Sequence, residues 1–153
     1  MKNCKKLGIV VHGDFQIGLP GETRVSIEKT IQLAMKLDPE TIQVSISHPY
    51  PGTEFDEYVR KQGYLTNDNM TDELGHQLPN ILYPGLDRKY MVQMVEHFYA
   101  RYYFRPGVIF RFLRKAASDA TERRRLFHEA KEFFKLRSKR RAFIQSAVSS
   151  SCF

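Results

Sequence analysis

The chain has 153 residues, of which 42% are hydrophobic and 12% aromatic, and this composition excludes a disordered or fibrous protein and indicates one globular domain. No run approaches the roughly 20 apolar residues of a membrane span, and the N-terminal stretch is too short and polar for a signal peptide, so we expect a cytoplasmic protein. The net charge of +7 comes from the C-terminal third, because residues 101–153 hold 14 Lys and Arg against 4 Asp and Glu.

Residues 7–17, LGIVVHGDFQI, are rich in Ile, Val and Phe and run into a Gly/Pro turn, which predicts a strand. A helix is expected from the N-cap Thr23 to about Asp38, just before Pro39. Residues 41–47, TIQVSIS, predict a second strand. Strand, helix and strand within this distance indicate a βαβ unit, and therefore two parallel strands joined by a right-handed crossover.

The rest of the chain reads as helical after an irregular stretch. EFDEYVRKQGYL predicts a short helix that stops at Gly63, and the residues after Arg88 are helical in pattern apart from a break at FRPG, residues 104–107. We therefore expect a βαβα segment over 1–65, an irregular connection over 66–87, a basic helical region over 88–145 and a disordered tail over 146–153.

Apolar residues at helical spacing predict which helix faces are buried. The expected core positions are Ile27, Ile31 and Ala34 in the first long helix, then Met91, Met94, Val95 and Phe98, then Phe110, Leu113 and Ala117, and finally Phe127, Ala130, Phe134 and Phe143.

Both predicted strands have one apolar and one polar face. His12, Asp14 and Gln16 alternate with apolar residues in the first strand, as Gln43, Ser45 and Ser47 do in the second. Parallel strands with a polar face suit a barrel whose lumen holds a ligand; a small α+β sheet with its polar face in water is the alternative. Because two strands cannot close a barrel, we expect the chain to be the C-terminal piece of a larger fold.

The strings HGDFQIGLPGET and TIQVSISHPYPGTEF resemble the fifth and sixth strands of the radical S-adenosylmethionine (SAM) barrel, in the subtype with an N-terminal cobalamin-binding domain. Together with FYARYYFRPGVIFRFLRK, they make residues 2 to about 141 most similar to the hopanoid-biosynthesis-associated radical SAM proteins. The resemblance implies an α/β fold: the C-terminal portion of a partial (β/α) barrel of TIM type, about two parallel strands plus helices, followed by a helical region.

The family cleaves SAM reductively with a [4Fe–4S] iron–sulfur cluster, held by a CxxxCxxC loop, and the resemblance implies radical modification of a hopanoid-like lipid. The sequence has no such loop, since its two cysteines are Cys4 and Cys152, and their spacing indicates neither a disulfide framework nor a metal site. The cobalamin domain and the first four strands are also missing. We therefore expect a polypeptide that is inactive alone and binds no cofactor stably. If it comes from a split gene, its partner is the missing N-terminal half; a truncated gene product is the alternative.

The resemblance places the adenosyl group of SAM beside the ends of the two strands. The residues implied are Phe15, Gln16, Ile17, Gly18, Ser45, Ser47 and Pro49. Lumen-facing positions that we expect to contact substrate are His12, Asp14, Gln43 and His48. Glu22 is shifted by one residue from the family pattern, and its expected role is a carboxylate at the start of a helix. GLPGET lacks the Lys of a phosphate loop, and the scattered histidines predict no metal site.

The aromatic and basic stretch 97–115, HFYARYYFRPGVIFRFLRK, is open to three interpretations. It fits helices that pack their aromatic rings inward and leave Arg stems exposed. It also fits a small basic binding module, either for single-stranded nucleic acid or for an acidic membrane surface. Nucleic acid is the less favoured partner, and peripheral membrane association would suit a lipid substrate.

Overall fold

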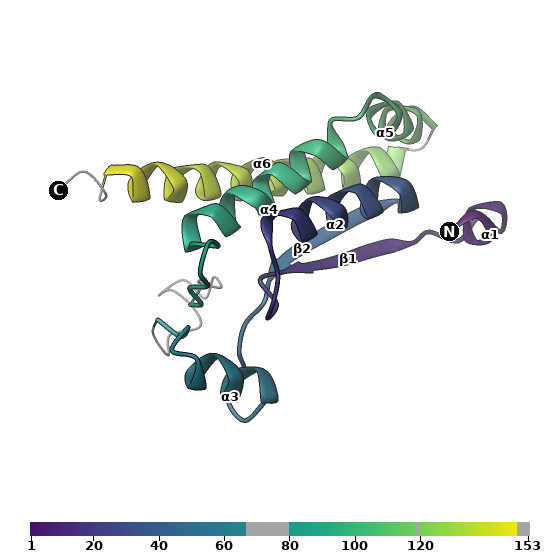
Figure 1. Cartoon of the computed structure of the whole chain (residues 1–153). Helices are drawn as coiled ribbons and strands as arrows, with labels where there is room; N and C mark the ends of the chain where they lie inside the picture. The colour runs from purple at the N-terminus through teal and green to yellow at the C-terminus, as the bar shows by residue number, and fades with distance from the viewer. Residues whose placement is uncertain (67–79, 119, 150–153) are drawn as a thin grey trace. The chain divides into compact units, whose positions relative to one another are not determined.

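The computed structural model describes residues 1–66, 80–118 and 120–149, which form an α/β structure of two parallel strands and six helices. This confirms the predicted fold class, which is α/β with two parallel strands and a helical C-terminal region. The elements, in chain order, are α1 (Lys2–Lys6), β1 (His12–Ile17), α2 (Arg24–Leu37), β2 (Thr41–Ile46), α3 (Glu54–Lys61), α4 (Arg88–Tyr103), α5 (Pro106–Ser118) and α6 (Ala120–Ser149) (Figure 1).

The chain divides into two compact units, Met1–Val95 and Glu96–Phe153, and the boundary falls inside α4. We call them the N-terminal unit and the C-terminal unit. The N-terminal unit contains the sheet, α1, α2 and α3, and the C-terminal unit contains α5 and α6.

The parallel sheet is formed by β1 and β2 in the register that pairs His12 with Thr41 and Ile17 with Ile46. Helix α2 lies along the strands (Figure 1) and buries the three predicted positions, which are Ile27, Ile31 and Ala34. The hydroxyl of Thr23 accepts a hydrogen bond from the Ser26 N–H, so the predicted N-cap is confirmed. Asp38, in the left-handed conformation with φ 47°, ends the helix.

Strand β1 is shorter than the predicted strand over residues 7–17. It begins at His12 because its partner strand begins at Thr41, so no earlier residue has a strand to pair with in the described structure. The Ile9 N–H instead donates to the Cys4 carbonyl at the end of α1. Leu7, Ile9 and Val10 are consequently exposed, at 75%, 54% and 68% of their surface.

Helix α3 ends where the sequence predicts, since Gly63 follows it with φ 70°. Most of the expected irregular connection, residues 67–79, lies outside the described residues. The described part of the connection is Thr66 and residues 80–87. Ile81 forms a short antiparallel bridge with Leu65, and Tyr83 forms one with Leu86.

The core of the C-terminal unit is aromatic. Phe98 and Tyr102 of α4 are fully buried, and the ring of Tyr103 packs edge-on against Phe133 of α6, with 5.5 Å between ring centres. The Glu96 side chain, which is 12% exposed, forms ion pairs with Arg137 and Arg140. Aromatic packing and this buried carboxylate together join α4 to α6.

The predicted buried faces of α5 and α6 are wrong. Phe110, Leu113, Phe127 and Phe134 are 55–75% exposed, and Ala117 and Ala130 are exposed as well. Val108 is buried instead, and Phe112 and Phe133 pack on the rings of α4. Both helices contain two overlapping apolar stripes, and contact with Tyr103 decides which one turns inward. The side chain of Phe143 lies outside the described set.

Helix α6 continues to Ser149, four residues into the predicted tail. The segment SAVS contains neither Gly nor Pro, so nothing in it stops an established helix from propagating. Residues 150–153 lie outside the described structure. No helix in the described ranges has both the length and the apolar character that crossing a membrane requires.

Candidate functional site at the carboxyl ends of the strands

The two strands end side by side and are locked together at that point. Ile17 and Ile46 are the last residues of β1 and β2, and they are paired. Beyond them, the Ser47 backbone N–H and hydroxyl both donate to the Ile17 carbonyl, at 2.7 and 3.0 Å. Ser47 is 1% exposed, so this double hydrogen bond is sheltered from water and fixes the spacing of the strand ends.

The turn after β1 is closed by two side chains that sequence reasoning did not place there. The Glu22 carboxylate accepts a hydrogen bond from the Gly18 N–H, and the Tyr83 hydroxyl donates to the Gly18 carbonyl at 3.2 Å. Gly18 is buried with φ 85°, a conformation that favours glycine. We expected Glu22 to act as a carboxylate at the start of a helix; in the structure it also contacts the turn directly, through the Gly18 N–H. No periodicity in the sequence points to Tyr83.

Burial of this turn shifts both ionisable groups that contact it. Desolvation raises the pKa of the Glu22 carboxyl, while hydrogen bonds from the Gly18 and Leu19 amides act in the opposite direction. Desolvation also raises the pKa of Tyr83, with smaller contributions from Tyr58, Glu22 and Tyr64. The Tyr83 hydroxyl therefore stays protonated at neutral pH and remains a hydrogen-bond donor.

The polar face of the sheet is open in the described structure. His12, Asp14, Gln16 and Gln43 are exposed and Ser45 is half-buried. His12 bridges two neighbours, because its Nδ1 lies 2.6 Å from the Thr41 hydroxyl and its Nε2 lies 3.2 Å from the Asp14 carboxylate. Gln16 and Ser45 are paired in register, which puts an amide and a hydroxyl next to each other close to the strand ends.

The structure separates the seven residues expected to contact SAM into three groups. Gln16 and Ser45 lie on the open polar face. Phe15 and Ile17 alternate to the opposite, apolar face of the sheet, and Ile17 is fully buried. The third group forms the buried ends of the strands: Gly18, Ser47 and Pro49.

His48, which follows β2, is buried with 7% of its surface exposed. Neither ring nitrogen has a hydrogen-bond partner of good geometry among the described residues. Burial lowers the pKa of His48, and the side chain of Asn80, itself 2% exposed, partly opposes that shift. The imidazole is therefore neutral at physiological pH and is set apart from the exposed residues His12, Asp14 and Gln43.

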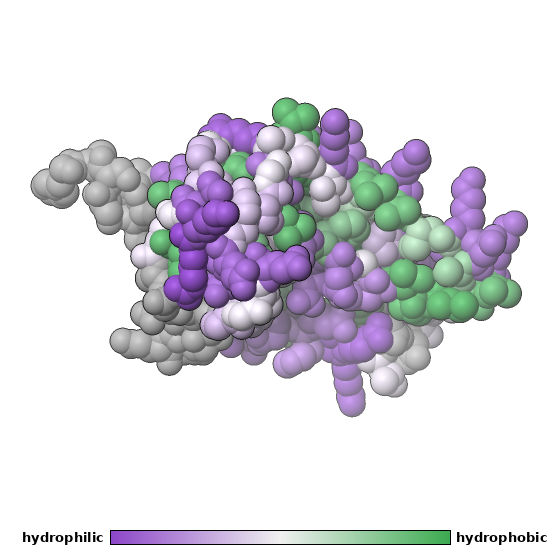
Figure 2. All heavy atoms as spheres, turned by 60° about the horizontal axis from the view of Figure 1, so that its bottom comes forward, coloured by the Kyte–Doolittle hydropathy of each residue, from purple (hydrophilic) through white to green (hydrophobic). Residues whose placement is uncertain are grey.

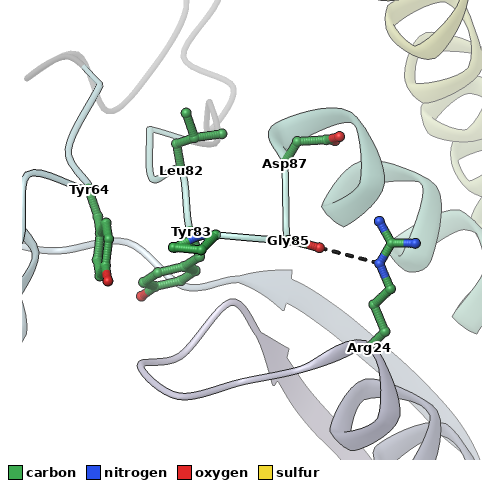
Figure 3. Close-up of a pocket in the computed structure, with 7 residues that line it drawn as sticks. Arg24, Tyr64, Leu82, Tyr83, Gly85 and Asp87 are labelled. Atoms are coloured by element: carbon green, nitrogen blue, oxygen red, sulfur yellow. Dashed lines mark hydrogen bonds between the residues drawn. The ribbon is translucent and has the colours of Figure 1, made fainter.

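A pocket of about 420 Å³ adjoins the turn. Its walls include the paired rings of Tyr64 and Tyr83, whose centres are 5.3 Å apart, and the side chain of Leu82 (Figure 3). Arg24, the first residue of α2, donates from Nε to the Gly85 carbonyl at 3.3 Å, as Figure 3 shows, and its guanidinium stacks 4.2 Å from the centre of the Tyr90 ring. The pocket thus offers aromatic surface beside one cation, Arg24, and one carboxylate, Asp87.

Metal ligands do not gather in the part of the chain that the structure describes: no three His, Cys, Asp or Glu side chains there lie close enough to hold an ion. The site offers hydrogen-bonding side chains on the polar face of the sheet and at the ends of the strands, together with the neighbouring aromatic pocket. Such groups can orient a polar organic ligand.

Two curated proteins of Pyrococcus horikoshii are similar to this chain. An uncharacterized methyltransferase is 44% identical over 69 residues, which are 45% of this chain and 15% of that protein. A probable threonylcarbamoyladenosine tRNA methylthiotransferase is 24% identical over 86 residues, which are 56% of this chain and 20% of that protein.

The aligned segments therefore cover at most a fifth of either relative. No family model matches the sequence. No solved structure matches it either. The chain is distantly homologous to a methyltransferase and to a methylthiotransferase, and this supports the radical SAM-like family that its turn motifs resemble.

Proposed function

We propose that this chain forms part of the SAM-binding wall of a radical SAM enzyme. The observation that carries the proposal is the pairing of Gln16 with Ser45 on an open polar face, at the carboxyl ends of parallel strands locked by Ser47. Barrel enzymes build their sites at this end of the strands. Similarity to a methyltransferase and a methylthiotransferase supports the same family.

We call the carboxyl ends of β1 and β2, together with the turn after β1, the rim. Two of its residues, Gln16 and Ser45, suit the nucleoside part of SAM. An adenosyl group presents ring nitrogens and ribose hydroxyls, which the Gln16 amide and the Ser45 hydroxyl can meet as donor and acceptor. The backbone groups of Gly18 are already used by Glu22 and Tyr83, so their role is to hold the edge rigid. Gln16 and Ser45 would hold and orient the nucleoside, and SAM bound beside a reduced cluster would supply radical chemistry there.

The residues present do not suit an iron–sulfur cluster. Its ligands are cysteine thiolates, and the sequence contains only Cys4 and Cys152, at opposite ends of the chain. We therefore propose that a companion polypeptide, encoded by the other part of a split gene, supplies the CxxxCxxC loop, the first strands and the cobalamin-binding domain. The substrate proposed is a hopanoid-like lipid. His12, Asp14 and Gln43 on the open polar face are its proposed contacts, whereas His48, which the sequence also suggested, is buried away from that face.

Reconstitution with the companion tests this function. The full chain and the companion are mixed anaerobically with iron, sulfide, a reductant and SAM, and 5′-deoxyadenosine is measured by liquid chromatography. We expect formation only when both polypeptides are present. Gln16→Ala with Ser45→Ala should lower the rate about tenfold or more, because two hydrogen bonds that position the nucleoside are lost.

Gln32→Ala is the matched control, because Gln32 is an exposed glutamine on α2 and has no place at the rim. The proposal fails if this chain alone forms 5′-deoxyadenosine, or if the double rim variant is as active as the Gln32 control.

Nucleic-acid binding by the aromatic and basic stretch has less support. Tyr99 and Tyr103 stack on each other, with 6.2 Å between their ring centres, and both pack edge-on against Phe133. Rings that are engaged in this core are not presented for stacking on bases.

A further inference from the structure

Helix α5 carries an apolar surface that the C-terminal unit does not use. Phe110 and Leu113 are 66% and 63% exposed, Ile109 is 42% exposed, and Ala117 is also exposed. At the helical spacing of 100° per residue these four residues fall within about a third of the circumference. We call this surface the α5 stripe. Other exposed apolar side chains occur in the described structure, among them Leu7 and Phe127 at 75% each, and on the face shown in Figure 2 apolar side chains gather in places between charged ones.

Helix α5 packs within the C-terminal unit through the side opposite the α5 stripe. Val108 is 2% exposed, and the Phe112 ring lies 6.1 Å from the ring of Tyr103. The helix therefore has a complete inner face without any contribution from the α5 stripe. An exposed Phe and Leu on one side of a short helix is a concentration of apolar surface that usually marks an interaction site.

The charged residue of α5 that borders the α5 stripe is a cation, Arg114. Helix α5 contains Arg111, Arg114 and Lys115 and no acidic residue, and Arg114 is exposed and adjoins the stripe on the helical projection. Arg123 and Arg124, in the first turns of α6, are exposed as well. The occupant that complements this surface has an apolar interior and a negatively charged boundary.

We propose that the α5 stripe inserts into the surface of an anionic lipid bilayer, with Arg114 at the level of the lipid phosphates. Ile109, Phe110 and Leu113 offer aliphatic and aromatic side chains without hydrogen-bonding groups, which suits acyl chains. A nucleic acid would use the arginines but would leave the aliphatic residues unpaired with any base. The proposal does not depend on the enzymatic function proposed above.

Sedimentation of the full chain with lipid vesicles tests this inference. We expect binding to vesicles of phosphatidylcholine with phosphatidylserine, and much weaker binding to phosphatidylcholine alone. Phe110→Ser and Leu113→Ser should each lower the partition coefficient about tenfold, since each removes one buried apolar side chain. Arg114→Gln should lower it about fivefold on the anionic vesicles only.

Leu33→Ser serves as the matched control, because Leu33 is 50% exposed on α2 in the N-terminal unit, and it should leave the partition coefficient unchanged. Far-UV circular dichroism verifies that each variant is folded. The proposal would be overturned by an absence of binding to anionic vesicles, by binding that Phe110→Ser and Leu113→Ser leave intact, or by light scattering that shows a dimer which these substitutions dissociate. Binding to single-stranded DNA that depends on Phe110 and Leu113 would also overturn it, in favour of a nucleic-acid surface.

Discussion

At the scale of single residues, the turn after β1 depends on a glycine and a carboxylate that act together. A Cβ atom on Gly18 would lie 3.2 Å from the Met91 sulfur, and its φ of 85° is one that other residues rarely adopt. In this conformation the Gly18 backbone N–H donates a hydrogen bond to the Glu22 carboxylate. The carboxylate is held in a partly desolvated place, and for that reason its protonation is coupled to folding.

The sign of this coupling gives a prediction for Glu22→Gln. Burial raises the folded-state pKa of Glu22 above its unfolded value, so folding takes up a proton between the two values. The stabilising contribution of the protonated carboxyl is therefore present at low pH and lost as pH rises through the folded-state pKa. The free energy of unfolding of the wild type minus that of Glu22→Gln should fall as pH rises above about 4, then level off. Urea unfolding at a series of pH values measures it.

Glu57→Gln, an exposed substitution on α3, controls for the general loss of one negative charge. A wild-type advantage over Glu22→Gln that instead grows with pH would show that the amides of Gly18 and Leu19 outweigh desolvation.

At the scale of elements, the sequence predicts what is set locally and misses what depends on neighbours. The Thr23 hydroxyl caps the start of α2 and Asp38, just before Pro39, ends it, so both ends are set by nearby residues. Alternation along β1 and β2 assigns their faces correctly. In α5 the stripe through Phe110 and the stripe through Phe112 are equally apolar in sequence. Only the packing of Tyr103 against Phe112 distinguishes them, and that contact joins residues of different helices.

The same local reasoning gives a prediction for α2. Thr23→Ala removes the side chain that accepts from the Ser26 N–H, and the free energy of unfolding should fall by about 1 kcal/mol. Thr23→Ser keeps the hydroxyl and should restore most of the loss. Urea unfolding followed by circular dichroism measures both variants. Equal losses for Ala and Ser would mean that the methyl group of Thr23, and not its cap, is what stabilises the helix.

At the scale of the whole molecule, the candidate site lies at the end of a sheet that has two strands in the described residues. The sequence predicted the polar sheet face, but not the closure of the rim by Glu22 and Tyr83, because Tyr83 lies 65 residues from its partner Gly18 and follows no periodic pattern. In the described structure both strands are edge strands, and a two-stranded sheet is marginal without further strands or helices. Further strands from the proposed companion would pair these edges.

Hydrogen exchange measured by mass spectrometry tests this completion of the sheet. When the companion polypeptide is added, amides of β1 or β2 that point away from the shared ladder should gain hydrogen bonds, and their exchange should slow at least about tenfold. Peptides from α3 serve as the internal control, because its backbone amides are already bonded within the helix. If the companion binds and the strand amides exchange as before, its strands do not extend this sheet, even if 5′-deoxyadenosine is formed. If the α3 amides slow by the same factor, the effect is a general stabilisation and not strand pairing.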